Sequence, residues 1–383
     1  MNLIPSETDR ELAAAVRVWG ESLGERVARG ERESTLPQGV VRELGVPAGL
    51  GVLGMTVPER DGGLGASTVA FALVLEELSA AWPSLAVGVS VNSGIVAGSL
   101  VRYGTAAQRG RWLPALMDGA GLGAFALTEP SSGSDAASLK ATAVKDGSGW
   151  RLSGRKQFIT SARYAPLFIV LARVGQPEAD RPHAGITAFI VPKDTPGLSI
   201  GTAERKMGLR ASDTSAIVLE DARVEGDAVL GEVGKGFGLA LAGLDAGRIG
   251  IAAQAVGIAR AAIGRAIAYG RGRQQFGRSI LTFGATRQSL AQSRAEIDAA
   301  RLLTHRAARL CDRGEPFTRE ASMAKLYASE AAQRATHAAV QICGGYGYMT
   351  EYEVERYARD ARATTLYEGT SEVQHMVIAR SLL

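Results

Sequence analysis

Two stretches near the C-terminus decide how this sequence is interpreted: Gln341-Ile-Cys-Gly-Gly-Tyr-Gly-Tyr-Met-Thr-Glu-Tyr-Glu-Val-Glu-Arg356 and Leu366-Tyr-Glu-Gly-Thr-Ser-Glu372. Glycine has no Cβ, so a glycine-rich backbone can take positive φ values and come close to a ligand. In the second stretch, Glu368 lies between a tyrosine and a glycine. A carboxylate held away from water there would have a raised pKa and could abstract a proton. Most glutamates are solvated, so this interpretation depends on other segments of the chain.

Composition indicates a globular protein and argues against several classes of partner. The chain has 383 residues, 46% hydrophobic and 21% charged, which is enough for a sizeable core in two or three domains or in one large layered fold. The net charge is +4 and no dense Lys/Arg block occurs, so a nucleic-acid partner is not expected. Cys311 and Cys343 are far apart and the histidines follow no ligand spacing, so neither a disulfide nor a metal site is predicted.

The sequence predicts a cytoplasmic protein with no membrane partner. The first residues, Met1 to Glu11, lack the basic-then-apolar layout of a signal peptide. The apolar runs are interrupted by glycine and arginine, so no transmembrane helix is expected.

The hydrophobic period changes twice along the chain, from helical to two-residue and back to helical. We therefore predict an α+β fold with an N-terminal all-α domain (1–120), a central β-barrel-like or β-sandwich domain (121–232) and a C-terminal four-helix bundle (233–383). The predicted helices cover 8–19, 67–78, 237–269, 285–311 and 318–342. The predicted strands cover 167–172, 186–191 and 216–220, with a hairpin formed by 140–145 and 150–160.

Two further segments place polar groups and an aromatic ring where a ligand could use them. Phe125-Ala-Leu-Thr-Glu-Pro-Ser-Ser-Gly-Ser-Asp135 gathers hydroxyls and backbone donors where the first helical block meets the β block. In Phe158-Ile-Thr160, strand alternation predicts that Phe158 and Thr160 share one face. Taken singly, the segments are equally compatible with a Ser/Gly turn and a half-buried strand.

Together, the segments at 125–135, 158–160, 341–345 and 367–372 resemble the acyl-CoA dehydrogenase family, in the same order and at similar separation. The resemblance spans essentially the whole chain. The combination of Thr-Glu-Pro-x-x-Gly-Ser-Asp with a distal Tyr-Glu-Gly-Thr is highly specific. Residues 244–254 and Ser322-Met-Ala-Lys-Leu326 are most similar to short-chain and short branched-chain members.

The resemblance implies an FAD-dependent enzyme in which Glu368 is the catalytic base. It implies that FAD is bound by Phe125, Leu127, Thr128, Ser134, Phe158, Thr160, Arg273, Phe276, Gln341, Gly344, Gly345, Thr370 and Glu372. It implies that the substrate is bound by Ser134, Asp245, Arg248, Tyr367 and Gly369. Arg273 and Phe276 would hold the FAD of a neighbouring subunit, and Gln341, Gly344, Gly345, Thr370 and Glu372 would complete the adenosine side. A site shared between subunits implies a homo-oligomer, which in the family is a tetramer.

Three departures from the family pattern affect the cofactor site. Phe158 replaces the usual tryptophan, and Ser131-Ser132 stand where Gly-Ala is common. Gly284 replaces a glutamine that would contact FAD, and we hypothesise that Arg287 compensates with its charge. Asp245 and Arg248 are equally compatible with a surface ion pair at i,i+3 spacing.

The implied reaction is α,β-dehydrogenation of a short or short branched-chain acyl-CoA to the trans-2-enoyl-CoA, with electrons passed to an electron-transfer flavoprotein. Glu368 would take the α-hydrogen as a proton, and FAD would accept the β-hydrogen as hydride. Three alternatives remain at this stage. They are the same chemistry on an acyl-carrier-protein thioester, a flavin-dependent monooxygenase on the same fold, and a non-catalytic module.

Overall fold

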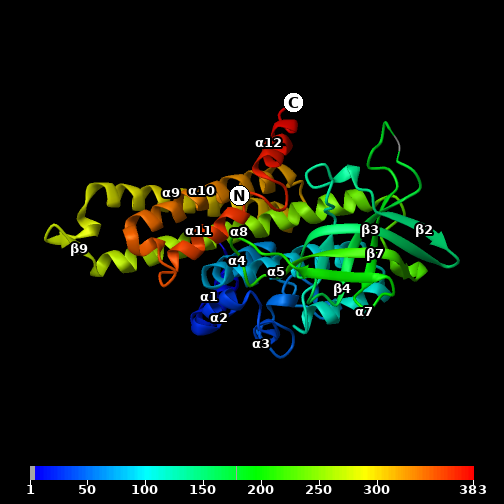
Figure 1. Ribbon diagram of the computed structural model, residues 1–383, viewed down its shortest axis with the longest axis horizontal. Helices are drawn as coiled ribbons and strands as arrows, with labels where there is room; N and C mark the ends of the chain where they lie inside the picture. Colours follow the sequence, from blue (N-terminus) through cyan, green and yellow to red (C-terminus); the bar gives the residue numbers. More distant parts are fainter. Residues whose placement is uncertain (1–4, 178) are drawn as a thin grey trace.

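The computed structural model describes residues 5–177 and 179–383, which form helices, then strands, then helices (Figure 1). The first block contains α1 (Glu7–Glu21), α2 (Gly24–Glu33), α3 (Gln38–Arg42), α4 (Thr68–Ala81), α5 (Pro83–Val89), a π-helical segment (Ser90–Ala97), α6 (Gly98–Tyr103) and α7 (Ala106–Met117). The β block contains β1 (Ala124–Ala126), β2 (Thr142–Asp146), β3 (Gly149–Thr160), β4 (Leu167–Val174), β5 (Ile186–Pro192), β6 (Leu198–Ala203), β7 (Thr214–Val224) and β8 (Val229–Leu230). The last block contains α8 (Gly236–Gly272), α9 (Gly284–Asp312), α10 (Thr318–Cys343), α11 (Val354–Ala363) and α12 (Ser371–Arg380), with the short pair β9 (Gln274–Gln275) and β10 (Arg278–Ser279) between α8 and α9.

Local sequence signals set the ends of the first helices. Ser6 caps α1 in a reciprocal capping box with Asp9, and the side chain of Ser67 accepts from Ala70 N at the start of α4. Such caps typically stabilise a helix by about 1 kcal/mol each. The predicted helices at 8–19 and 67–78 are therefore confirmed, with each observed helix a few residues longer at its C-terminal end.

The strands form one sheet in the order β6-β7-β3-β2-β4-β5-β8, with β1 parallel to β4. The predicted hairpin is confirmed, since β2 pairs antiparallel with β3 across Gly147 and Ser148. Trp150 on β3 and Phe189 on β5 are not on neighbouring strands, yet their rings meet edge-on with centroids 5.5 Å apart. The sheet therefore curls around its own apolar core, which agrees with the predicted central β domain.

The last block is built on α8, which at 37 residues is about 55 Å long. α9 and α10 pack along it and α11 packs on α8 and α10, giving four helices of a bundle. The predicted helices at 237–269, 285–311 and 318–342 are confirmed within a few residues. The largest buried cluster is shared by this bundle and the N-terminal helices, so the two helical blocks enclose one core.

Two helices are apolar and long enough to cross a membrane by length and composition alone, which does not contradict the prediction that the chain has no transmembrane helix. They are Pro83–Tyr103 and Gly236–Gly272, and 83% and 67% of their most apolar windows are buried inside the protein. Core helices of soluble proteins pass the same test, so this finding is weak support for a membrane span.

Candidate active site

Glu368 lies in a strained turn between α11 and α12. Its φ is 53°, and that of Gly369 is 93°. A left-handed backbone costs a non-glycine residue about 1–2 kcal/mol, so other contacts must hold this turn. Thr370 follows as the N-cap of α12, where its side chain accepts from Val373 N. The turn is thus fixed on its C-terminal side by the helix that it starts.

Two side chains, from α10 and α12, donate to the backbone of this turn, and the side chain of Tyr367 bonds to α8. Lys325 Nζ on α10 donates to the carbonyl of Gly369 (2.7 Å). Gln374 Nε2 donates to the carbonyls of Gly369 (2.8 Å) and Glu368 (3.3 Å). The hydroxyl of Tyr367 donates to Oε1 of Gln254 on α8. Hydrogen bonds therefore fix the backbone at Glu368 and Gly369 and the side chain of the preceding Tyr367.

The carboxylate of Glu368 points at the backbone of α8 at Gly247, where the helix has no side chain. A β-carbon added to Gly247 on α8 would lie 2.2 Å from Oε2 of Glu368. Although part of the residue is accessible, both carboxylate oxygens are buried, and neither has a hydrogen-bond partner among the residues that the structure describes. Desolvation raises the pKa of Glu368 to about 7, against the opposing effect of the positive charges of Lys325 and Arg248. This carboxyl can therefore exchange a proton near neutral pH.

Asp245 and Arg248, which the resemblance assigns to the substrate, form an i,i+3 ion pair with Nη1 2.6 Å from Oδ1, but the pair is not on the surface as the alternative interpretation expected. Arg248 is buried, and its Nε lacks a partner within the described ranges. Asp245 also accepts from Thr318, and burial raises the pKa of its carboxyl. Since Arg248 acts electrostatically on Glu368, the pair belongs to the surroundings of the Glu368 carboxylate.

The two other predicted segments lie side by side in the β block. Gln157 N donates to the carbonyl of Thr128 (2.8 Å), which joins the Thr-Glu-Pro loop to β3. A bulge in β3 interrupts the expected alternation and leaves Phe158 at φ 58° and 63% exposed, with Thr160 half-buried. Leu127 is buried and Thr128 and Phe125 are half-buried, whereas Ser134 is exposed. An open aromatic face beside two threonines fits a flat heteroaromatic ligand such as the flavin ring.

A buried ion pair that was not predicted from the sequence lies beneath the surface formed by Phe158 and the Thr-Glu-Pro loop. Lys156 Nζ on β3 lies 2.8 Å from Oε1 of Glu129 and donates to the carbonyl of Leu127 (3.1 Å). Glu129 also accepts from the backbone N–H groups of Lys140 and Ala141 (2.6 and 2.9 Å). Only the glutamate stood in a quoted motif, and nothing in the sequence spacing connected it with Lys156.

The remaining predicted cofactor residues form a second cluster at the far end of the bundle. Arg273, Gly344 and Gly345 line a cavity of about 580 Å³, and the nearby Phe276 is 94% exposed. The stretch of α8 from Gly247 to Arg273 is about 40 Å long, and Figure 1 shows β9 at the end opposite the β block. One chain therefore does not bring Arg273 and Glu368 to one ligand.

The expected grouping of Gln341 with Thr370 and Glu372 is also absent within a single chain. Thr370 and Glu372 adjoin Gly369, which contacts Lys325. Gln341 lies about 24 Å farther along α10 than Lys325, next to the cavity with Gly344 and Gly345. The hypothesis for Arg287 stays untested, although its Nε donates to the carbonyl of Leu281 near this end (3.1 Å).

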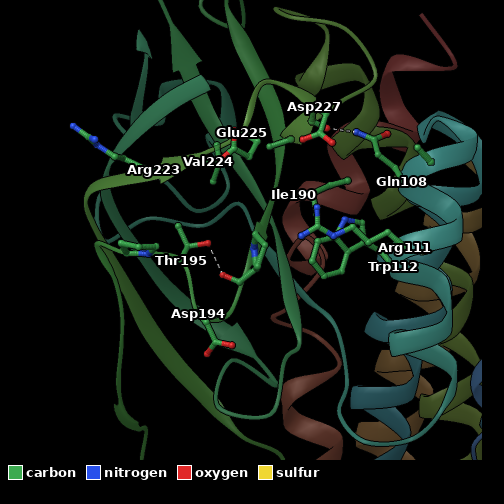
Figure 2. A pocket seen from close by; sticks show the side chains of 14 residues that line it. Gln108, Arg111, Trp112, Ile190, Asp194, Thr195, Arg223, Val224, Glu225 and Asp227 are labelled. Atoms are coloured by element: carbon green, nitrogen blue, oxygen red, sulfur yellow. Dashed lines mark hydrogen bonds between the residues drawn. The ribbon is translucent and has the colours of Figure 1, made fainter. Parts of the chain in front are cut away.

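A third feature, a cavity of about 300 Å³ between α7 and the β block, was not predicted (Figure 2). On its helical wall, Arg111 stacks over Trp112 at 4.5 Å. Gln108 bridges the wall to the strands by donating to the carbonyls of Asp227 and Val229 (2.7 and 2.9 Å). The cavity shares no lining residue with the Glu368 site.

Comparison with known proteins identifies the family. Residues 6–120, 124–222 and 234–383 match the N-terminal, middle and C-terminal domains of acyl-CoA dehydrogenases. The mitochondrial short-chain specific acyl-CoA dehydrogenase of Mus musculus is 43% identical over 98% of this chain and 90% of its own length. Butyryl-CoA dehydrogenase from Megasphaera elsdenii has a TM-score of 0.95 and 38% identity, with both chains fully covered. A glutaryl-CoA dehydrogenase from Mycobacterium smegmatis, solved with FADH2, has a TM-score of 0.92 and 33% identity, covering 99% of this chain and 95% of its own. The chain therefore belongs to the acyl-CoA dehydrogenase family and is an FAD-dependent oxidoreductase.

Proposed function

We propose that this enzyme dehydrogenates a short or short branched-chain acyl-CoA to the trans-2-enoyl-CoA, with Glu368 as the base that takes the α-proton. The observation that carries the proposal is the buried Glu368 carboxylate, which has no partner among the described residues and a pKa raised to about 7. The preference for short chains is supported by the likeness to the short-chain specific and butyryl-CoA enzymes.

The turn can supply both groups that α-proton abstraction from a thioester needs. Above pH 7 the carboxylate of Glu368 is mostly ionised and has a free lone pair for the proton. Its own backbone N–H meets no acceptor from the described residues, so it is available to the thioester oxygen, where negative charge develops. Leu127, Thr128, Phe158 and Thr160 would hold the flavin ring of FAD. When bound, FAD supplies the acceptor for the β-hydrogen and its electron pair.

An anaerobic titration of the FAD-loaded protein with acyl-CoAs of increasing length tests this proposal. We expect bleaching of the flavin absorbance to be fastest with short chains. We expect Glu368→Gln to keep its yellow flavin and to lose reduction by at least about 10²-fold, the usual contribution of a general base. Bleaching of this variant at the unaltered rate would rule out Glu368 as the base.

We infer that an electron-transfer flavoprotein accepts the electrons, as the family resemblance implies. Adding that protein to the substrate-reduced enzyme should restore the flavin absorbance faster than air does. Rapid reoxidation by air with a hydroxylated product would instead indicate a monooxygenase. Turnover on CoA and carrier-protein thioesters of one acyl group decides which carrier the substrate uses.

We further infer that the cofactor site is shared between two chains of a homo-oligomer. The separation of about 40 Å between the Glu368 and Arg273 clusters supports this inference, since a single FAD cannot contact both in one chain.

A further inference from the structure

Two buried side chains outside the predicted set converge on the peptide that follows Glu368. Lys325 on α10 and Gln374 on α12 are both fully buried, and both donate to the carbonyl of Gly369 (2.7 and 2.8 Å). Gln374 donates in addition to the carbonyl of Glu368 (3.3 Å). A β-carbon on Gly369 would lie 2.6 Å from Nε2 of Gln374, so this approach requires the glycine.

The ammonium of Lys325 is beside the base but does not pair with it. No ion pair joins Lys325 to the Glu368 carboxylate within 4 Å in the part of the chain that the structure describes. The two nevertheless interact electrostatically, and the negative charge of Glu368 opposes the desolvation that lowers the pKa of Lys325 to about 8. The other charged group that acts on Glu368 is Arg248 of α8, which is already paired with Asp245.

This arrangement suits a base better than a direct ion pair would. A carboxylate bonded to an ammonium is stabilised in its ionised form and has little affinity for a proton. A buried carboxylate with no positive charge nearby stays protonated and has no free lone pair. A lysine that bonds to the next carbonyl supplies the charge and leaves both carboxylate oxygens open.

We propose that Lys325 and Gln374 are positioning residues for Glu368: their hydrogen bonds hold the left-handed turn that presents the carboxylate, and the Lys325 ammonium keeps it ionised without bonding to it. This inference rests on the proposed role of Glu368 as the base. The two residues have different roles. Gln374 holds the turn by hydrogen bonds alone, whereas Lys325 holds the turn and also places a positive charge near the carboxylate.

Two matched substitutions separate these contributions. Lys325→Met and Gln374→Met replace each side chain with an unbranched apolar one, and only the first removes a charge. FAD-loaded variants are reduced anaerobically with butyryl-CoA from pH 5.5 to 9. We expect Gln374→Met to lower the limiting reduction rate by about 10²-fold at every pH, as misplacement of a catalytic group does. We expect Lys325→Met to lower this rate too. In addition, the fall in the reduction rate at acidic pH should begin at a higher pH, so that the rate loses about a further tenfold at pH 6 relative to pH 9.

A second measurement does not depend on turnover. Difference infrared spectroscopy follows ionisation of the Glu368 carboxyl, assigned as the band that Glu368→Gln removes. We expect this band to titrate at higher pH in Lys325→Met and at the unaltered pH in Gln374→Met. If Lys325→Met does not fold, Lys325→Gln, which keeps a donor and loses the charge, takes its place.

The outcomes distinguish this inference from the proposed function. Full-rate reduction of Glu368→Gln overturns the role of Glu368 and this inference with it. An inactive Glu368→Gln together with unchanged rates and pH profiles in the Lys325 and Gln374 variants overturns this inference alone.

Discussion

At the scale of single residues, the site depends on the absence of one side chain. A methyl group at Gly247 would occupy the position of Oε2 of Glu368, and the atom it meets belongs to a carboxylate that is held by its turn. The clash would have to move the carboxylate, because α8 is a central helix of the bundle and its backbone cannot shift easily.

We therefore expect Gly247→Ala to retain FAD and to lose about 10²-fold in the rate of flavin reduction, since displacement by about 1 Å has such effects. Gly264 is a matched control on the same helix, because an added β-carbon meets nothing within 4 Å there. Gly264→Ala should keep full activity and be more stable by about 0.4–1 kcal/mol. Equal activity of the two variants would contradict the close contact.

The raised pKa of Glu368 also predicts how stability depends on pH. The ordinary pKa of 4.5 applies in the unfolded chain, and the folded value is about 7. The folded protein therefore binds a proton that the unfolded chain releases, and this stabilisation is present below pH 4.5 and lost as the pH rises through 7. The Gln side chain of Glu368→Gln carries no charge at any pH. We therefore expect its free energy of unfolding at pH 8, measured by denaturant titration, to exceed that of the unaltered protein by up to about 3 kcal/mol. At pH 5 the two proteins should differ little, and a difference independent of pH would show that the carboxyl is not protonated on folding.

At the scale of elements, the surface that we propose for the flavin ring, formed by Leu127, Thr128, Phe158 and Thr160, depends on how β3 is attached to the Thr-Glu-Pro loop. The Lys156–Glu129 pair and the Lys156 bond to the carbonyl of Leu127 tie these two segments together inside the protein. Desolvation lowers the pKa of Lys156 to about 8, with the charge of Glu129 opposing it, so both partners need each other to remain charged.

Removing one partner of a buried pair typically costs about 3–5 kcal/mol, because the other charge is left uncompensated. We expect Lys156→Met to lower the melting temperature of the FAD-loaded protein and to increase FAD dissociation, measured by flavin fluorescence. Lys140→Met is the control, since the exposed Lys140 side chain lies on the same loop and only its backbone N–H contacts Glu129. A Lys156→Met protein as stable as this control would mean that the pair does not hold the loop.

At the scale of the whole molecule, the sequence predicted what is local and missed what depends on contacts between distant segments. The hydrophobic period predicted α1, α4, α8, α9 and α10, whereas α2, α3, α5, α6, α7, α11 and α12 were not predicted. The Tyr-Glu-Gly-Thr stretch correctly predicted that Glu368 lies in a turn. The bonds of Lys325 and Gln374 to the Glu368 turn were not predictable, because a lysine in an alanine-rich helix gives no sign of what it faces. Strand β6 was missed for a similar reason: it is largely exposed and its position is defined by pairing with β7.

The distance between the Glu368 cluster and the Arg273 cluster leads to a prediction that tests whether two chains share one site. If Glu368 of one chain and Arg273 of another act on the same FAD, two different defects can complement each other. Glu368→Gln and Arg273→Ala chains should each be inactive alone. In a mixed oligomer, the intact Glu368 of an Arg273→Ala chain and the intact Arg273 of a Glu368→Gln chain should together form functional sites.

Co-expression with two affinity tags and purification through both gives the mixed species. We expect it to recover about a quarter to a half of the unaltered activity, depending on how the chains are arranged. If each chain completed its own site, no mixture of these two variants would regain activity, since every chain would still carry one of the two defects.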